Sequence, residues 1–223
     1  MGQFVDLTSG DGFVFPAWVA QPDAAPRGAV VVLQEIFGVN SHIRAVADRF
    51  AARGYLAVAP STFHRVKPGV DLGYTGDDMQ AGMGLKAAVE ALPAPGVMPD
   101  IQAARQVRSP PQQKPTMPTL RPLCAACTLT GLSAAVPYSG GGMTSPDEAA
   151  RQPRVPVLAH FGERDHWIPV DSVQAFARAQ PGAEVHIYAA DHGFNCDQRG
   201  SYDEPAAMTA RDRTLAFFDK HLA

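Results

Sequence analysis

The stretch that most constrains the fold is Val155–Pro169, with the sequence VPVLAHFGERDHWIP. Its apolar run stops at Phe161-Gly162 and opens into a polar loop that carries Asp165. Such a run is typical of a buried parallel strand. Because open α/β sheets place their chemistry at the carboxyl ends of parallel strands, the stretch predicts an α/β fold with Asp165 at a site.

A second motif, Asp191-His192-Gly193-Phe194, follows one predicted helix (Val170–Ala179) and one predicted strand (Glu184–Tyr188). The order strand, Asp, helix, strand, His matches the end of the nucleophile–acid–histidine order of α/β-hydrolases. In such a site the aspartate orients the imidazole, which takes the proton of the nucleophile. The spacing therefore predicts that Asp165 and His192 act as a pair, although a lone Asp or His is more often structural. His166 is a possible hydrogen-bonding residue of the loop.

The first part of the chain predicts a hairpin and a βαβ unit. Phe4–Ala20 alternates apolar and polar residues around a Gly/Asp turn, which indicates the hairpin. Ala29–Leu33 and Tyr55–Ala59 are expected to be strands, joined by a helix that Ser41 caps and Gly54 ends. The prediction is a single-domain α/β-hydrolase fold over residues 1–223, with a mainly parallel sheet flanked by helices.

The middle of the chain interrupts this pattern. Helices are expected over Met79–Leu92 and from Pro99 onward, but Arg105–Leu123 is rich in proline, which breaks helices and removes strand donors. Order is expected to return with a strand at Ser133–Tyr138, and a closing helix is predicted over Glu204–His221.

Composition narrows the possible functions. The 223 residues are 46% hydrophobic and 18% charged, which suits a chain with a full core. The net charge of −3, without a long basic run, argues against nucleic acid as a partner. We see no apolar run long enough for a membrane span and no signal peptide, so no membrane partner and a cytoplasmic location are expected. Three cysteines argue against a disulfide framework.

Glu35 and Ile36 directly follow the first buried strand, in the sequence QEIFG. Glu35 is either a polar loop residue or a base that assists a nucleophile. The loop after this strand commonly supplies an oxyanion donor in α/β-hydrolases, which makes the backbone N–H of Ile36 a candidate.

The nucleophile is harder to find. An α/β-hydrolase needs a strained G-x-Ser/Cys-x-G turn, and none occurs between Asp100 and Ser133. Cys124 and Cys127 are the only thiols there; each is also consistent with a small apolar residue on a buried helix. A redox pair and a zinc site both lack the further residues that they need. Cys196 follows the histidine and breaks the triad order, and a serine nucleophile at Ser133 or Ser139 is a weaker alternative.

At this point the chain resembles the dienelactone hydrolase family. The resemblance covers about Phe13–Ala104 and Ser133–Ala223, and it rests on motifs in five places: Gln34–Asn40, Arg53-Gly54-Tyr55 through Ala59-Pro60, Pro137-Tyr138, Gly162-x-x-Asp165-His166-x-x-Pro169, and His192-Gly193-Phe194. It implies hydrolysis of an enol-lactone or related ester in aromatic degradation, by a cysteine nucleophile without metal or cofactor. It also implies that Asp165 and His192 complete a triad and that Glu35 assists thiolate formation.

The chain departs from that family in two respects. First, the family's G-x-C-x-G-G turn is absent, and Arg105–Leu123 resembles nothing in that family. Second, the arginines that hold the substrate carboxylate in the family are not visible in this sequence. Our main hypothesis is a cysteine-dependent carboxylic ester or lactone hydrolase, a monomer or homodimer, with Cys124 as nominal nucleophile. One alternative is a non-catalytic relative that binds a small ester or acid. The other is a shifted reading frame over Arg105–Leu123.

Overall fold

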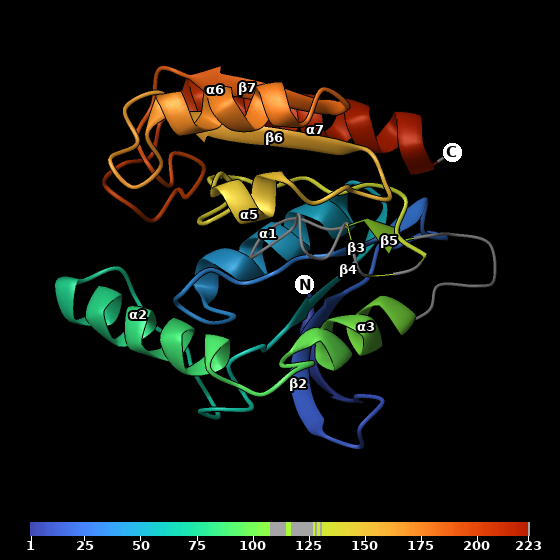
Figure 1. Ribbon diagram of the computed structural model, residues 1–223. Helices are drawn as coiled ribbons and strands as arrows, with labels where there is room; N and C mark the ends of the chain where they lie inside the picture. The colour runs from blue at the N-terminus through green and yellow to red at the C-terminus, as the bar shows by residue number, and fades with distance from the viewer. Residues whose placement is uncertain (108–114, 117–126, 128, 130, 223) are drawn as a thin grey trace. The chain divides into compact units, whose positions relative to one another are not determined.

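The computed structural model describes residues 1–107, 115–116, 127, 129 and 131–222. Two compact units, Met1–Pro115 and Thr116–Ala223, are described separately below. A two-residue strand, β5 (Pro115–Thr116), lies where one unit passes into the other. Figure 1 labels the elements along the chain.

The first unit begins with the predicted hairpin. β1 (Gln3–Thr8) pairs antiparallel with β2 (Val14–Ala20), in a register that sets Thr8 opposite Val14. The turn between them includes Gly12 with φ of 83°, a left-handed conformation that glycine adopts without strain. The hairpin expected from Phe4–Ala20 is thus confirmed.

A βαβ unit follows and extends the same sheet. β3 (Gly28–Val31) pairs in parallel with β4 (Tyr55–Pro60), and β4 pairs antiparallel with β2, so these strands are ordered β1-β2-β4-β3. The helix between them, α1 (Ser41–Ala52), packs on β2 and β4.

The predicted cap of α1 was wrong by one residue. The N-cap is Asn40, whose side-chain oxygen accepts the backbone N–H of Ile43 at 3.2 Å, and Ser41 is already helical. An asparagine caps a helix as well as a serine does, so composition alone does not separate the two positions. The predicted end of the helix is confirmed, because Gly54 has φ of 89° directly after it.

Two further helices belong to the first unit. α2 (Gly76–Glu90) begins with a capping box in which Thr75 and Asp78 exchange hydrogen bonds. α3 (Met98–Gln106) packs against β3 and β4 and buries Ile101 and Ala104. Both helices were expected, and both begin within a few residues of the predicted positions.

The second unit has the helices and strands expected from Val155–Pro169 onward. After the short α5 (Pro146–Ala149) come β6 (Val157–Gly162), α6 (Val170–Ala179) and β7 (Ala183–Tyr188), and α7 (Glu204–Leu222) closes the chain. β6 and β7 are parallel along their whole length.

The strand predicted over Ser133–Tyr138 is reduced to two isolated parallel bridges to β6. Ala135 bridges Val157, and Tyr138 bridges His160. At its end, the backbone N–H of Ser139 donates to the carbonyl of His160 at 2.8 Å. Pro137 has no N–H to donate, which explains why the pairing is not continuous.

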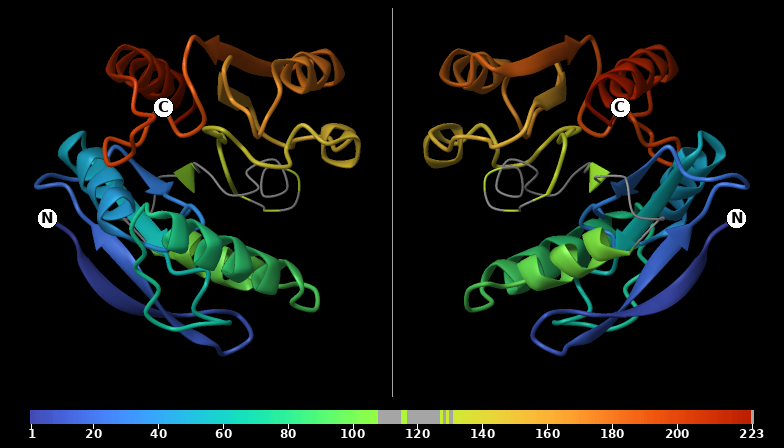
Figure 2. Two further views of the ribbon diagram at one scale, coloured as in Figure 1. Left: turned by 90° about the vertical axis from the view of Figure 1, so that its left-hand side faces the viewer. Right: turned by 90° about the vertical axis from the view of Figure 1, so that its right-hand side faces the viewer.

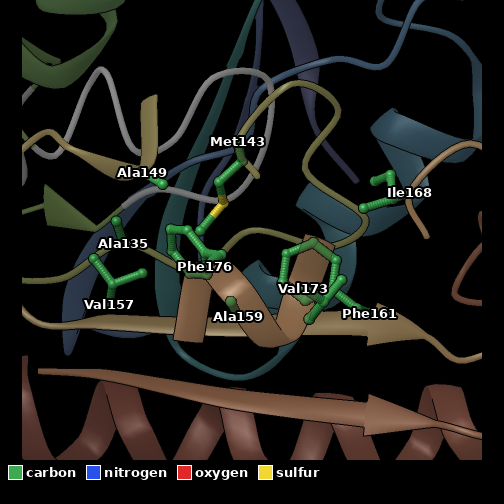
Figure 3. Close-up of a cluster of buried hydrophobic side chains, with 9 residues drawn as sticks. All are labelled: Ala135, Met143, Ala149, Val157, Ala159, Phe161, Ile168, Val173 and Phe176. Carbon is green, nitrogen blue, oxygen red and sulfur yellow. The ribbon is translucent and has the colours of Figure 1, made fainter. Parts of the chain in front are cut away.

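The helices α6 and α7 cover opposite faces of the β6–β7 pair (Figures 1 and 2). Side chains alternate along a strand, so Val157, Ala159 and Phe161 share one face of β6. They form a buried cluster with residues of α6 that include Val173 and Phe176 (Figure 3). The other face of β6 contacts α7.

These elements confirm the predicted α/β class, with parallel strand pairs in each unit and an N-terminal hairpin. Among the described residues, no helix is both long enough and apolar enough to cross a membrane. The single-domain organisation stays a prediction.

Candidate active site

Asp165 and His192 are in direct contact in the second unit. Nδ1 of His192 lies 2.7 Å from Oδ2 of Asp165. The other carboxylate oxygen, Oδ1, accepts the backbone N–H groups of Trp167 at 2.8 Å and Ile168 at 2.9 Å. Because these bonds fix the plane of the carboxylate, Asp165 can hold the imidazole in one orientation with its proton on Nδ1.

The chain brings the two residues together at the carboxyl ends of β6 and β7. The backbone N–H of Glu163 donates to Tyr188 at 2.7 Å, and that of Arg164 donates to Ala190 at 3.0 Å. These bonds continue the β6–β7 pairing by two residues beyond the strands. The loop with Asp165 therefore runs beside the loop with His192.

The Asp165 carboxylate is stabilised in its charged form. Burial by itself raises the pKa of Asp165. The hydrogen bond and charge interaction with His192, together with the two backbone N–H groups, lower the pKa by more than burial raises it. The net effect is a pKa below the ordinary value, so Asp165 is ionised at neutral pH.

His192 combines a fixed side with an accessible one. Its side chain is 29% exposed, whereas the side chain of Asp165 is fully buried. Within the described part of the second unit, Nε2 of His192 has no hydrogen-bond partner. With Nδ1 bound to Asp165, Nε2 is the nitrogen that can accept a proton from a nucleophile.

The turn after His192 is closed by backbone hydrogen bonds. Gly193 has φ of 75°, and the N–H of Cys196 donates to its carbonyl at 2.9 Å. The N–H of Asp203 returns to the carbonyl of Phe194 at 3.0 Å. These bonds fix the loop that carries the imidazole.

Glu35 and Ile36 lie in the first unit, in the loop after β3, and both are half-buried. This loop is tightly held: a Cβ on Gly38 would stand 2.2 Å from the carbonyl oxygen of Val70, and one on Gly82 would stand 2.4 Å from that of Ile36. Among residues 1–107, the backbone N–H of Ile36 makes no hydrogen bond. Within that range no acceptor occupies this N–H, as the predicted role of an oxyanion donor requires.

The sequence did not indicate that Tyr74 is a hydrogen-bond partner of Glu35. The hydroxyl of Tyr74 donates to Oε2 of Glu35 at 3.3 Å. Tyr74 comes from the glycine-rich segment before α2, which has no periodic pattern, so no signal in the sequence pointed to it.

The structure describes some of the candidate nucleophiles but not all of them. Cys124 lies outside the described residues. Cys127 is half-buried and packs against the buried cluster of β6 and α6, and Cys196 is buried. Ser139 has φ of 44°, and its buried hydroxyl has no hydrogen-bond partner among the described residues. His166, suggested above as a loop hydrogen-bonder, is exposed, and backbone N–H groups fill that role at Asp165 instead.

Comparisons with known proteins show the family of the chain. The model of the dienelactone hydrolase family matches residues 15–117 and 119–222, and so includes nearly all of the proline-rich segment. The carboxymethylenebutenolidase of Pseudomonas putida is 32% identical over 238 residues, which cover 96% of this chain and 94% of that protein. A "Putative carboxymethylenebutenolidase" of Synechocystis sp. is 32% identical over 227 residues, covering 92% of this chain and 91% of that protein.

A solved structure is also similar. The crystal structure of a "Putative Dienelactone Hydrolase" from Klebsiella pneumoniae superposes with a TM-score of 0.78 at 30% sequence identity. The match covers 97% of this chain and 99% of that one.

Proposed function

The chain belongs to the dienelactone hydrolase family and is a hydrolase with an α/β-hydrolase fold, and on this premise we propose that it cleaves small carboxylic esters or lactones. The proposed machinery is a Cys-His-Asp triad assisted by a glutamate. The observation that carries the proposal is the 2.7 Å contact between His192 and the buried carboxylate of Asp165.

The proposal gives each residue one task. His192 accepts the proton of the nucleophile through Nε2, and Asp165 stabilises the imidazolium that forms. The nucleophile bonds to the ester carbonyl carbon, and the N–H of Ile36 stabilises the resulting oxyanion. When the carbon–oxygen bond breaks, His192 returns the proton to the leaving alkoxide. A water molecule then hydrolyses the acyl-enzyme by the same route and releases the acid.

Cys124 is the proposed nucleophile, with Glu35 assisting its ionisation. A thiolate is the reactive form of cysteine, so a neighbouring base or cation is required. The family membership supports this assignment more than any local motif does, because the chain has no G-x-C-x-G turn.

Ser139 is a second candidate nucleophile. Two specific observations favour it: its left-handed φ of 44°, and a hydroxyl without a hydrogen-bond partner in the described part of the chain. A strained backbone and an unbound nucleophilic group are features of active sites. It also precedes three glycines, which leave room for a substrate.

The test is turnover of a dienelactone and of p-nitrophenyl acetate by the whole chain. We expect hydrolysis that His192→Ala abolishes and that Asp165→Asn reduces by roughly 10³-fold or more, because the amide stabilises the wrong tautomer. Circular dichroism of each variant controls for folding. Turnover equal to that of His192→Ala would refute the proposal.

Two further variants decide the nucleophile. Loss of activity in Cys124→Ala with activity retained in Ser139→Ala supports the cysteine, and the reverse supports the serine. The non-catalytic alternative is not favoured by relatives named as hydrolases. It would require that a lactone shift the melting temperature of the protein without being consumed.

A further inference from the structure

The hydrogen bond between Tyr74 and Glu35 has a fixed direction. Oδ1 of Asn40 accepts the N–H of Ile43 at 3.2 Å, so the amide cannot be turned over. The Nδ2 group therefore donates to the hydroxyl oxygen of Tyr74, at 3.2 Å, and to the carbonyl of Leu72, at 3.0 Å. Since this oxygen accepts from Asn40, its own proton is left to bond Oε2 of Glu35 at 3.3 Å.

The segment that carries Tyr74 is firmly attached to the loop of Glu35. The N–H of Leu72 donates to the carbonyl of Phe37 at 2.9 Å, and the backbones of Asp71 and Gly38 form an isolated antiparallel β-bridge. The ring of Tyr74 also packs edge-on against Phe37, with 4.6 Å between ring centroids. Phe37 is only 1% exposed, so the phenol rests on the core of the unit.

Asp71 adds an ion pair to this attachment. Its Oδ2 lies 2.8 Å from Nη1 of Arg44, and the same nitrogen donates to the carbonyl of Val39 at 2.8 Å. Arg44 is on α1, so the helix, the loop after β3 and the segment of Tyr74 form one connected framework. A group mounted on this framework can hold a carboxylate in one rotamer.

We propose that Tyr74 is a positioning residue for Glu35: its hydroxyl occupies Oε2, so that Oε1 is presented to the reacting groups. This inference rests on the role given to Glu35 in the proposed function. Asn40 is then the residue that directs the phenol proton toward Glu35. The hydrogen-bond relay from Asn40 through Tyr74 to Glu35 should affect the rate of the chemical step and not substrate binding.

The kinetic test is a double-mutant cycle on ester turnover. Tyr74→Phe removes only the hydroxyl and is expected to lower kcat by about 5-fold with KM unchanged. In a Glu35→Gln background the same substitution is expected to have no further effect. Tyr202→Phe, which removes the hydroxyl of a tyrosine that is 40% exposed in the other unit, serves as the matched control and is expected to leave kcat unchanged.

Asn40→Asp tests the direction of the relay. Aspartate caps a helix as well as asparagine does, so α1 is retained, but the carboxylate accepts the phenol proton and takes it from Glu35. We expect a loss of kcat similar to that of Tyr74→Phe. Thermal unfolding of both variants shows whether the loss comes from folding.

A carbon NMR measurement makes the test independent of turnover. With ¹³C at Cδ of the glutamates, the Glu35 resonance is the one missing in Glu35→Gln. It is expected to shift in Tyr74→Phe and in Asn40→Asp but not in Tyr202→Phe. An unmoved resonance would overturn the inference.

The kinetic outcomes separate the two proposals. If Glu35→Gln lowers kcat but Tyr74→Phe does not, the inference fails and the proposed function stands. A rise in KM alone in Tyr74→Phe also overturns the inference, since it places the phenol against the substrate. Turnover no greater than that of His192→Ala refutes the proposed function, and the NMR shift then decides the positioning role by itself.

Discussion

Gly162 lies directly against the backbone of Ala190: a methyl group on Gly162 would stand 2.4 Å from the carbonyl oxygen of Ala190. It would also stand 2.9 Å from the carbonyl oxygen of Asp191. These carbonyls immediately precede His192, and Gly162 ends the strand that leads to Asp165. The close approach of two backbones is therefore what sets the acid and the histidine side by side.

We expect Gly162→Ala to separate these backbones. Because the obstacle is backbone rather than a flexible side chain, the free energy of unfolding should fall by about 1–3 kcal/mol, as for an overpacked core. Ester turnover should fall as well, since the Asp165–His192 contact is lengthened. Urea denaturation measures the first effect. Gly182→Ala is the control: a methyl group there meets nothing within 4 Å, so equal destabilisation of both variants would contradict the argument.

His160 is at the centre of a buried hydrogen-bond chain under the same loops. Arg213 donates to the hydroxyl oxygen of Tyr188 at 3.0 Å, and this hydroxyl lies 2.9 Å from Nδ1 of His160. Nε2 of the same imidazole lies 3.0 Å from the hydroxyl of Thr214. That hydroxyl in turn donates to the carbonyl of Ala210 at 2.9 Å. A second proton on His160 would place a charge in this buried site.

Acid should therefore unfold the protein partly through His160. Burial, together with the charges of His186 and Arg213, lowers the pKa of His160 to about 3. Since the unfolded histidine binds a proton near pH 6.5, the unfolded state holds more protons between these values, and stability is lost as the pH falls from about 6.5 toward 3. Urea midpoints at pH 7, 5.5 and 4.5 should fall less steeply in His160→Gln. His166→Gln, at an exposed position, should keep the slope of the parent; the same slope in both variants would rule out this role of His160.

The sequence predicted most of the elements because their patterns are local. Periodic apolar residues and a glycine stop are enough to locate α1, and an apolar run ending at Gly162 locates β6. The contact between Asp165 and His192 was expected for a related reason: parallel strands end at the same edge of a sheet. Their catalytic role stays a prediction.

What the sequence did not predict depends on tertiary contacts. Tyr74 stands in a segment without periodicity, and only its attachment to the loop of Glu35 gives it a role. The buried hydrogen bond between His160 and Thr214 depends on α7 packing on β6, a contact that no local pattern indicates. The strand at Ser133–Tyr138 was expected to be continuous, but pairing is limited to two bridges.

Ser139 should tolerate glycine better than alanine. A left-handed φ of 44° is strained for any residue with a Cβ, and the buried hydroxyl lacks a partner among the residues that the structure describes. Ser139→Gly removes both costs and should raise the free energy of unfolding by about 0.5–1 kcal/mol, after the greater freedom of glycine in the unfolded chain is subtracted. Ser139→Ala removes only the hydroxyl and should stabilise less. Urea denaturation ranks the three proteins, and a parent more stable than Ser139→Gly would show that the strain is absent.

The ion pair of Arg65 with Asp100 should be the most costly to break in the first unit. Two guanidinium nitrogens of Arg65 contact the carboxylate of Asp100, at 2.7 and 2.6 Å, and Asp100 is fully buried. Its hydrogen bonds to Asp100 and Asp11 raise the pKa of Arg65. A guanidinium group is charged at neutral pH even without such partners, so the cation persists when Asp100 is removed. Asp100→Ala thus leaves a largely buried charge without its main partner, and the free energy of unfolding should fall by about 3 kcal/mol.

Asp11 provides the matched comparison, because its carboxylate contacts the same guanidinium group at 2.9 Å but is 45% exposed. Water replaces an exposed partner at little cost, so Asp11→Ala should change the stability much less than Asp100→Ala does. Urea denaturation at neutral pH compares the two variants directly. Equal losses would mean that burial does not set the strength of this pair and would contradict the prediction.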